Sequence, residues 1–527
     1  MKCLLLSFAL IVATGSAFAP SQNKYGSSLS LSSYTSSLYA WNDMFSIQQP
    51  RTILFSSSKT TTTDIETEHR QGQIMPNTLV VGGGLAGLAT AAALRNIANI
   101  DAVHVVERMC DTLANESAGA AIQLGPNAFK ALEAIGGGKT FVEKIYEAGS
   151  VLEETLILLP GAADGTATPT ASIPNTAKAE TGYPIVLVRW GVLRKLLGEL
   201  LPEESLSFGT GSEIVGYAFS DGDDDDDKGV EPVDKEGKKV AVDGSSFSSS
   251  QLIIGADGLH SVFRERVQTN TMTVPVLEKD SEQPVSSSSS LKDMKRVNIK
   301  AVVPVELKEL GLPFTKEGAT FAQFSPQLAG FAGPAGKGYT YWAISVADDE
   351  ESGSKFLSSV NDNDDDYQDA SKKLLLEKLE ATSSSDGVDR KWIISLVERT
   401  DSNAILINRS LEAPVKETDS FVSKDTRVVL VGDAAHAMSA SYGQSASFAF
   451  EDAATLALLL KENNENDNGS SSSSRNNDVA KALQDYSDKR TGRCMEMQRR
   501  SEERATKAMR GEKDLEDVSK WVHAWKP

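Results

Sequence analysis

Four short apolar runs predict buried strands, and one alanine-rich stretch between two of them predicts a helix. The runs are Thr78–Val81, Ala102–Val106, Leu252–Ile254 and Val428–Val431. The helical stretch, Leu88–Leu94, follows the first run after a glycine-rich turn. Continuous apolar runs of this length are typical of strands that are buried on both sides. The pattern predicts an α/β fold.

Two other segments have a different pattern, because they are rich in residues that favour strands. These segments are Val151–Val188 and Val297–Val346, and they predict a second, β-rich part of the molecule. Val479–Lys507 is helical in pattern and highly charged, which predicts a solvated packing helix. Gly136–Gly138 follows a predicted helix and is therefore interpreted as its C-terminal cap.

Low-complexity stretches interrupt these patterned segments. Their Ser, Asp, Asn and Gly content is not expected to contribute to a packed core. Without them and the N-terminal region, somewhat under 400 residues remain, which is enough for two domains. The sequence shows no internal repeat. The stretches are Asp221–Ser250, Ser281–Ser290, Asp348–Asp369, Ser383–Asp389 and Glu462–Asn477.

The N-terminus has the pattern of a targeting segment. Met1-Lys2 gives a positive start, Leu4–Val12 an apolar core and Gly15–Ala17 a zone of small residues, as in a signal peptide. Ser21–Thr63 is rich in Ser and Thr and nearly free of acids, as in an organelle transit peptide. We expect a signal peptide over residues 1–19 and a disordered transit peptide over residues 20–70.

The junction Ala17-Phe18-Ala19-Pro20 resembles the junction of bipartite plastid presequences in diatoms and related algae. That resemblance implies delivery to a complex plastid. Plain secretion with a disordered N-terminal tail is the alternative.

Charge and cysteine content exclude several classes of protein. The chain has 53 Lys+Arg and 73 Asp+Glu, a formal net charge of −20, which argues against nucleic acid or an anionic membrane surface as the main partner. Its three cysteines exclude a disulfide scaffold and lack zinc-ligand spacing, so no metal site is predicted. No apolar run after the N-terminal region has membrane-spanning length, although peripheral contact with a thylakoid membrane is left open.

The turn after the first strand has the chemistry of a phosphate-binding loop. Gly82, Gly84 and Gly87 form the pattern G-x-G-x-x-G between a strand and a helix. Gly82 permits the tight turn, Gly84 lets the backbone approach a pyrophosphate, and Gly87 allows close packing of helix on strand. Glu107 ends the second strand, where an acid accepts hydrogen bonds from an adenosine ribose. This spacing predicts dinucleotide binding.

Two more motifs follow later strands, at Asp257-Gly258 and at Gly432-Asp433. With the glycine fingerprint, they resemble the motifs of the FAD-dependent aromatic-hydroxylase superfamily. This group of single-component flavoprotein monooxygenases includes salicylate hydroxylase and zeaxanthin epoxidase. Supporting matches are Gly119–Ala128, Arg189 and Glu451–Ala453. The resemblance covers about Asn77 to Arg493.

The resemblance implies a Rossmann-like FAD-binding domain of the para-hydroxybenzoate hydroxylase type, an antiparallel β-sheet substrate domain that roofs the flavin, and a C-terminal helix. Aromatic side chains of the second sheet could line the substrate pocket, but buried core is the preferred interpretation for each of them (Phe321, Phe324, Phe331 and Trp342). The expected ranges are residues 76–150, 186–275 and 405–461 for the FAD-binding domain, 151–185 and 296–404 for the substrate domain, and 478–527 for the C-terminal helical region.

The resemblance also assigns residues to the cofactor one by one. The fingerprint would hold the pyrophosphate, Glu107 the ribose, and Asp433 the ribityl chain. His260 and His436 are interpreted as structural, and no catalytic side chain is assigned. The predicted cofactor-binding residues are Gly82, Gly84, Leu85, Ala86, Gly87, Glu107, Arg108, Gln123, Arg189, Asp257, Gly258, Gly432, Asp433, Gly443, Gln444 and Ser445.

The last motif departs from the family at two positions. Ala440 stands where a Pro is usual, and Ser445 stands where the second Gly of Gly-Gln-Gly is usual. Because backbone amides survive both changes and Ser is a sound N-cap, FAD binding is expected to persist. The pocket beside the flavin ring is expected to be reshaped.

The expected activity is that of an FAD-dependent monooxygenase. By resemblance it would use NAD(P)H and O2 to hydroxylate or epoxidise a small, electron-rich molecule, with phenols and carotenoids as candidate substrates. A flavoprotein reductase or dehydrogenase acting on an isoprenoid, and a non-catalytic FAD-binding protein, are the alternatives. The halogenase motif Trp-x-Trp-x-Ile-Pro is absent around Trp190, Trp342 and Trp392, which disfavours a flavin halogenase.

Overall fold

The protein is described by a computed structural model. Among the residues that it describes, no helix is long and apolar enough to cross a membrane. The predicted segments 1–19 and 20–70 lie outside the residues that the structure describes. The described residues are 77–110, 113–159, 170–209, 214–219, 229–240, 252–269, 291–306, 318–325, 327–348, 367–381, 388–439, 442–465, 472–509 and 518–527.

A five-stranded parallel sheet contains the four apolar runs of the sequence. The strand order is β17 (Val428–Leu430), β11 (Leu252–Gly255), β1 (Thr78–Val81), β2 (Val103–Glu107) and β8 (Leu206–Phe208). All four of its pairings are parallel, and β17, β11 and β1 are buried throughout, whereas the edge strand β8 is half-buried. Because both faces are covered, the strands read as continuous apolar segments rather than alternating ones.

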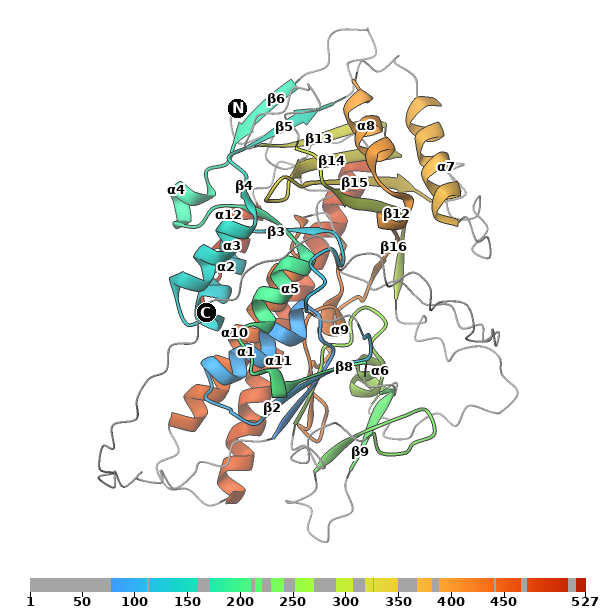
Figure 1. The fold of residues 1–527 in the computed structure, drawn as a ribbon. Helices are drawn as coiled ribbons and strands as arrows, with labels where there is room; N and C mark the ends of the chain where they lie inside the picture. Colours follow the sequence, from blue (N-terminus) through green and yellow to red (C-terminus); the bar gives the residue numbers. More distant parts are fainter. Residues whose placement is uncertain are drawn as a thin grey trace, which may run out of the picture. The chain divides into compact units, whose positions relative to one another are not determined.

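Helices surround this sheet (Figure 1). The long helix α10 lies beside α1, and the longer α11 lies beside α10. α1 contacts α10, and α10 contacts α11 and α2. Four alanines of α1 are fully buried, which allows these helices to approach closely: Ala89, Ala91, Ala92 and Ala93. The bounds are α1 (Leu85–Asn96), α2 (Pro126–Ile135), α3 (Lys139–Ala148), α5 (Trp190–Gly198), α6 (Val262–Thr269), α9 (Asp433–His436), α10 (Ser445–Glu465), α11 (Ser472–Met509) and α12 (Val518–His523).

A second, seven-stranded sheet is antiparallel except where β13 pairs with β5. Two helices, α7 (Tyr367–Ala381) and α8 (Lys391–Arg399), pack on one of its faces through Leu375, Trp392 and Leu396 (Figure 1). The strand order is β16 (Leu406–Glu412), β12 (Lys292–Val303), β15 (Thr340–Ala347), β14 (Leu328–Pro334), β13 (Gly318–Ser325), β5 (Glu154–Leu158) and β6 (Thr170–Pro174).

Smaller elements complete the described part of the chain. An antiparallel three-stranded sheet has the order β3 (Ala121–Leu124), β7 (Val186–Arg189) and β4 (Ser150–Val151). β9 (Gly216–Phe219) and β10 (Val230–Val233) form an antiparallel pair. The short helical elements are α4 (Ala177–Thr181), η1 (Glu203–Ser205) and η6 (Ser402–Ala404).

The predicted fold class is confirmed, since a parallel α/β part and an antiparallel sheet are both present. Gly136 ends α2 as expected, and α11 includes the predicted helix 479–507. The charged helix is not simply solvated, because Tyr486 is fully buried and Arg490 is 1% exposed. Buried carboxylates on α10 explain this difference, because they pair with the arginine.

Two boundaries differ from the sequence-based expectation. β16 lies in the seven-stranded sheet through its pairing with β12, although residues 405–461 were expected in the FAD-binding domain. β10 lies inside the acidic low-complexity stretch Asp221–Ser250, and its Val230 and Val233 are buried. Four residues with a valine at each end are enough to make a strand when they pair with β9, whatever the composition of the surrounding sequence.

Candidate active site

The fingerprint loop between β1 and α1 requires glycine at two positions for steric reasons. Gly82 has φ +117°, and a Cβ there would lie 2.3 Å from the Ala256 carbonyl oxygen. A Cβ on Gly87 would lie 1.9 Å from the carbonyl oxygen of Gly82. Gly84 differs, because a Cβ there would meet no protein atom within 4 Å. The side of the loop that Gly84 borders is therefore open, as a pyrophosphate cradle must be.

Helix α1 begins directly at this open side. Gly84 is its N-cap and provides no side-chain cap, so the first-turn amides keep their capacity to bind an anion. Leu85 is buried, and Ala86 packs against the third motif, since a Cβ on Gly432 would lie 2.7 Å from the Ala86 Cβ. The geometry of these residues fits the predicted phosphate contact.

Glu107 fixes the shape of the same loop. One carboxylate oxygen accepts the backbone N–H of Gly83 at 2.8 Å, and the other accepts that of Met109 at 3.0 Å. Each oxygen retains a lone pair that can accept a hydroxyl, so ribose binding and loop anchoring are compatible. The neighbouring Arg108 is exposed.

Arg194 on α5 also holds the loop, and the sequence analysis missed it. Its Nε donates to the carbonyl oxygen of Gly83 at 2.8 Å, and the side chain is 4% exposed. The guanidinium lies 5.4 Å from the ring centroid of Trp190 and 5.3 Å from that of Phe208. Because Arg194 binds a backbone carbonyl of a distant segment, no local pattern in the sequence indicates this contact.

Gln123 and Arg189 lie on the neighbouring strands β3 and β7. Arg189 is 8% exposed, its guanidinium lies 4.3 Å above the ring of Tyr339, and its Nη2 is 3.5 Å from Glu116 Oε2. Its buried Nε has no hydrogen-bond partner in the described structure. Gln123 is 6% exposed. Arg189 therefore offers a polar group that a cofactor could satisfy.

The second motif follows β11 and begins α6. Asp257 Oδ2 accepts the backbone N–H of Val262 at 2.8 Å, whereas its buried Oδ1 has no partner among the described residues. Burial raises the pKa of Asp257, although hydrogen bonds to Ser261 and Val262 oppose this shift. Gly258 has φ +81° and open space at its Cβ position. An unsatisfied carboxylate oxygen beside open backbone fits a site for hydroxyl or amide donors of a ligand.

Arg264 connects the second and third motifs and was also missed. It is 2% exposed and donates to the carbonyl oxygens of Asp433, Ala434 and Leu259 at 3.1, 3.1 and 2.6 Å. Because Arg264 binds backbone carbonyl groups rather than acidic side chains, no local charge pattern in the sequence indicates this contact.

The third motif brings Asp433 and the start of α10 together. Gly432 has φ +59° and Gly443 has φ +66°, conformations that favour glycine. Ser445 donates to Asp433 Oδ1 at 2.6 Å, so this departure from the family gives the carboxylate a protein donor instead of the expected N-cap. Gln444 Oε1 accepts from Asn127 at 3.0 Å. Ala440, the other departure, lies outside the described residues.

A buried charge network supports this motif from behind. His436 is fully buried and its Nε2 lies 2.6 Å from Asp452 Oδ2, which also accepts the Gly432 N–H at 2.8 Å. Arg490 donates to Asp452 Oδ1 and to Glu451 Oε2, both at 2.6 Å. Burial alone would lower the pKa of His436, but the Asp452 carboxylate raises it well above the ordinary value.

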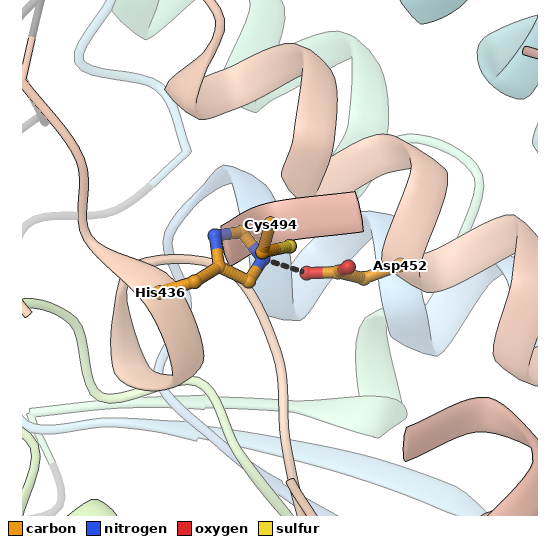
Figure 2. A group of neighbouring side chains, drawn as sticks. All are labelled: His436, Asp452 and Cys494. Atoms are coloured by element: carbon orange, nitrogen blue, oxygen red, sulfur yellow. Dashed lines mark hydrogen bonds and ion pairs between the residues drawn. The ribbon is translucent and has the colours of Figure 1, made fainter. Parts of the chain in front are cut away.

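Figure 2 shows that His436, Asp452 and Cys494 come together, with one potential ligand atom from each within 4.8 Å of the others. The arrangement does not suit a metal ion, because Asp452 already accepts three donors and the Arg490 guanidinium repels a cation. The structural interpretation of His436 agrees with this network. His260, in contrast, is exposed.

The seven-stranded sheet turns one face toward the FAD-binding part. Phe321, Phe331 and Tyr341 lie on it in a common core with Ala121 and Leu187 of the small sheet. We call this the site face. Phe324 and Trp342 lie on the opposite face, against α7 and α8, so they are core residues. Phe321 and Phe331 are buried on the site face, so all four aromatic residues are core residues, as the sequence-based interpretation expected.

Comparisons with known proteins agree with this geometry. Residues 75–290 match the family model described as "FAD binding domain". Aurachin C monooxygenase/isomerase of Stigmatella aurantiaca is 27% identical over 384 residues, which cover 72% of this chain and 80% of that protein. FAD-dependent monooxygenase ausM of Penicillium brasilianum is 25% identical over 384 residues, 72% of this chain and 69% of that protein.

Solved structures share the fold at low identity. Klebsiella pneumoniae HpxO, solved with FAD and uric acid, is 20% identical with a TM-score of 0.58, and the match covers 85% of this chain and 93% of that one. 2,6-Dihydroxypyridine-3-hydroxylase from Arthrobacter nicotinovorans is 16% identical with a TM-score of 0.55, covering 83% and 93%.

Fold and site thus define an α/β protein of the para-hydroxybenzoate hydroxylase-like architecture, with an FAD-binding domain. The domain match and the relatives together support an FAD-dependent oxidoreductase.

Proposed function

We propose that this protein is an FAD-dependent monooxygenase that uses NAD(P)H and O2. The observation that supports it best is the meeting of three motif turns at the carboxyl edge of one parallel sheet, where Gly84 leaves open space and Asp257 keeps an unpaired oxygen. Ligands of open α/β sheets bind at this edge. The names of the relatives, all of which include "monooxygenase", point to the same reaction.

The chain's own residues would bind and orient the cofactor. The first-turn amides of α1 would hold the pyrophosphate, and Glu107, Arg189 and Asp433 would contact the sugar and ribityl groups. Bound FAD would supply redox and oxygen chemistry that no amino-acid side chain provides. The site face of the seven-stranded sheet would exclude water and position the substrate.

Overall, one oxygen atom of O2 would enter the substrate and the other would leave as water, with two electrons supplied by NAD(P)H. Phenols and carotenoids are the two substrate classes to test, because both are electron-rich. The assay supplies NADPH or NADH, 18O2 and each class to the chain from Thr63 onward. Substrate-dependent incorporation of 18O is the expected result.

Other outcomes would favour the alternatives. A changed product without 18O would indicate a reductase or dehydrogenase. Bound FAD that NAD(P)H does not reduce in the presence of any substrate would indicate a non-catalytic FAD-binding protein.

We also propose import into a complex plastid, with peripheral contact to thylakoid membranes as a further option. The support is the signal-like segment, the Ser/Thr-rich region and the junction at Phe18. Residues 1–74 fused to a fluorescent protein in a diatom should reach the plastid, whereas a Phe18→Ala fusion should be held outside it. Secretion of both fusions would contradict the proposal.

A further inference from the structure

Lys300 is a buried charge in the middle of β12. It is 3% exposed, and its backbone pairs with Ala343 of β15 and Leu406 of β16. Within the described residues, no hydrogen bond or ion pair engages its ammonium. Lysine is almost never this buried unless it is paired. The position therefore needs an explanation other than packing.

The ammonium lies on the site face. Successive side chains of a strand alternate between faces, and Ile299 and Ala301 belong to the core beneath α7 and α8. Lys300 consequently points the other way, to the side that carries Phe331 and Tyr341. Arg296 of the same strand differs, because its Nε donates to Ser345 Oγ at 2.8 Å.

The charge of the third motif acts on Lys300. Burial lowers the pKa of Lys300 to about 8, and the negative charge of Asp433 acts in the opposite direction. No ion pair within 4.0 Å joins the two groups, and Asp433 already accepts the hydroxyl of Ser445. The ammonium is thus buried on the site face, in the field of Asp433, with no hydrogen bond or ion pair to a described residue.

We propose that the Lys300 ammonium binds an anionic oxygen of a small aromatic substrate, which the site face holds at the candidate active site. This inference rests on the proposed monooxygenase function and narrows its substrate class. A phenolate or carboxylate would supply the charge-assisted hydrogen bond that the ammonium lacks. The site face, whose buried core includes Phe331 and Tyr341, would give the ring apolar surroundings.

The same reasoning disfavours a carotenoid. A hydrocarbon chain against the site face would leave the ammonium buried with no partner, which is energetically costly. Ionisation also makes an aromatic ring more electron-rich, so the charge that Lys300 recognises would favour oxygenation of the ring that it holds.

The test measures binding to the FAD-loaded protein with two matched pairs of probes. Pentafluorophenol and benzoate are ionised at neutral pH, whereas pentafluoroanisole and benzamide are their neutral counterparts. Flavin difference spectra and calorimetry give each Kd. We expect both anions to bind more tightly than their neutral partners, and Lys300→Met to weaken the anions by about ten- to a hundredfold.

Controls separate charge recognition from general damage. Lys300→Arg should keep most of the anion affinity, and Lys300→Met should leave the neutral probes unchanged. Lys292→Met, on the exposed end of the same strand, should match the wild type, since Lys292 pairs only with Glu502 in the described structure. Zeaxanthin is the neutral polyene control and should not lose affinity in Lys300→Met.

Anion affinities unchanged by Lys300→Met, or no anion binding to the wild type at millimolar concentration, would overturn the inference. FAD content and reduction by NAD(P)H, measured on the same samples, test the proposed function separately. A protein that binds anions through Lys300 yet never incorporates 18O would contradict only the proposed function.

Discussion

Two surfaces border the candidate site, and they differ in whether protein groups pair with their buried charges. At the carboxyl edge of the parallel sheet, charges are matched by protein groups: Glu107 holds two backbone amides, and Asp452 holds Gly432, His436 and Arg490. On the site face of the seven-stranded sheet, Lys300 has no such partner in the described part of the chain. The acids of the first surface each have at least one protein donor, although Asp257 keeps one oxygen unpaired, whereas the ammonium of the second surface has no described partner.

The largest expected effect is the loss of FAD at the parallel-sheet edge in Gly84→Val. Gly84 has an extended backbone conformation, φ −80° and ψ −174°, which valine adopts readily, and no protein atom obstructs its side chain. The variant should therefore fold but bind no FAD, because the side chain would occupy the pyrophosphate position.

Flavin absorbance per protein and circular dichroism check this result. Gly492→Val is the matched control, since Gly492 is exposed in α11 with open space at its Cβ position. A folded Gly84→Val protein with stoichiometric FAD would show that the loop is assigned wrongly.

The second largest effect is expected on stability, when buried carboxylates lose the arginine that pairs with them. Arg490→Met would leave Glu451 and Asp452 buried with fewer partners, so the free energy of unfolding should fall by about 3–5 kcal/mol. Urea titration measures it. Arg499→Met on the exposed side of α11 is the control and should change stability by less than about 1 kcal/mol. Similar losses of stability in the two variants would contradict the expected difference between the buried and the exposed arginine.

Removing the unmatched charge of Lys300 should have the opposite effect on the free energy of unfolding. Without substrate, Lys300→Met should be more stable than the wild type by up to roughly 3 kcal/mol near pH 7, because the folded-state pKa of about 8 lies below the ordinary 10.5. Between these two values the unfolded state binds more protons, so wild-type stability rises with pH. The gap between the proteins should therefore close from pH 8 to pH 10.5.

Urea midpoints over this pH range test the prediction, with Lys292→Met as the control that shows no such convergence. A wild type that is more stable than Lys300→Met at neutral pH would indicate a protein partner for the ammonium.

The smallest effect is expected for Ser445→Gly, which introduces the residue usual in the family. It removes the 2.6 Å hydrogen bond to Asp433 and frees that carboxylate oxygen for the cofactor. One hydrogen bond contributes about 1 kcal/mol, so the Kd for FAD should fall by no more than about tenfold. Fluorescence titration of FAD measures the change. Weaker binding would mean that Ser445 itself contacts the cofactor.

The sequence predicted the parallel-sheet edge well because its demands are local. Gly82 and Gly87 are required by contacts within one strand–turn–helix unit, and Glu107 follows at the spacing that this unit imposes. Arg194 and Arg264 were missed because they bind backbone carbonyl groups of distant segments. Such contacts leave no periodic signal in the sequence.

Lys300 illustrates a different limit. Val297, Ile299, Ala301 and Val303 alternate with other residues along β12, a pattern typical of a strand with one face in water. In the structure the second face is covered as well, so the lysine is buried. Alternation identifies which residues share a face, but only the tertiary arrangement decides what covers each face.

The path of the chain between the two sheets has a consequence for folding. β5 and β6 follow the first segment of the FAD-binding part in the sequence and are synthesised early. Leu156 of β5 nevertheless pairs in parallel with Thr320 of β13, a strand that is synthesised much later. Pairing across so long a loop has a large closure entropy and is expected to be slow. During translation, β5 can pair with β6, but its other edge lacks β13 while the parallel sheet is still acquiring β11. The nascent chain is therefore expected to need chaperone protection at this point.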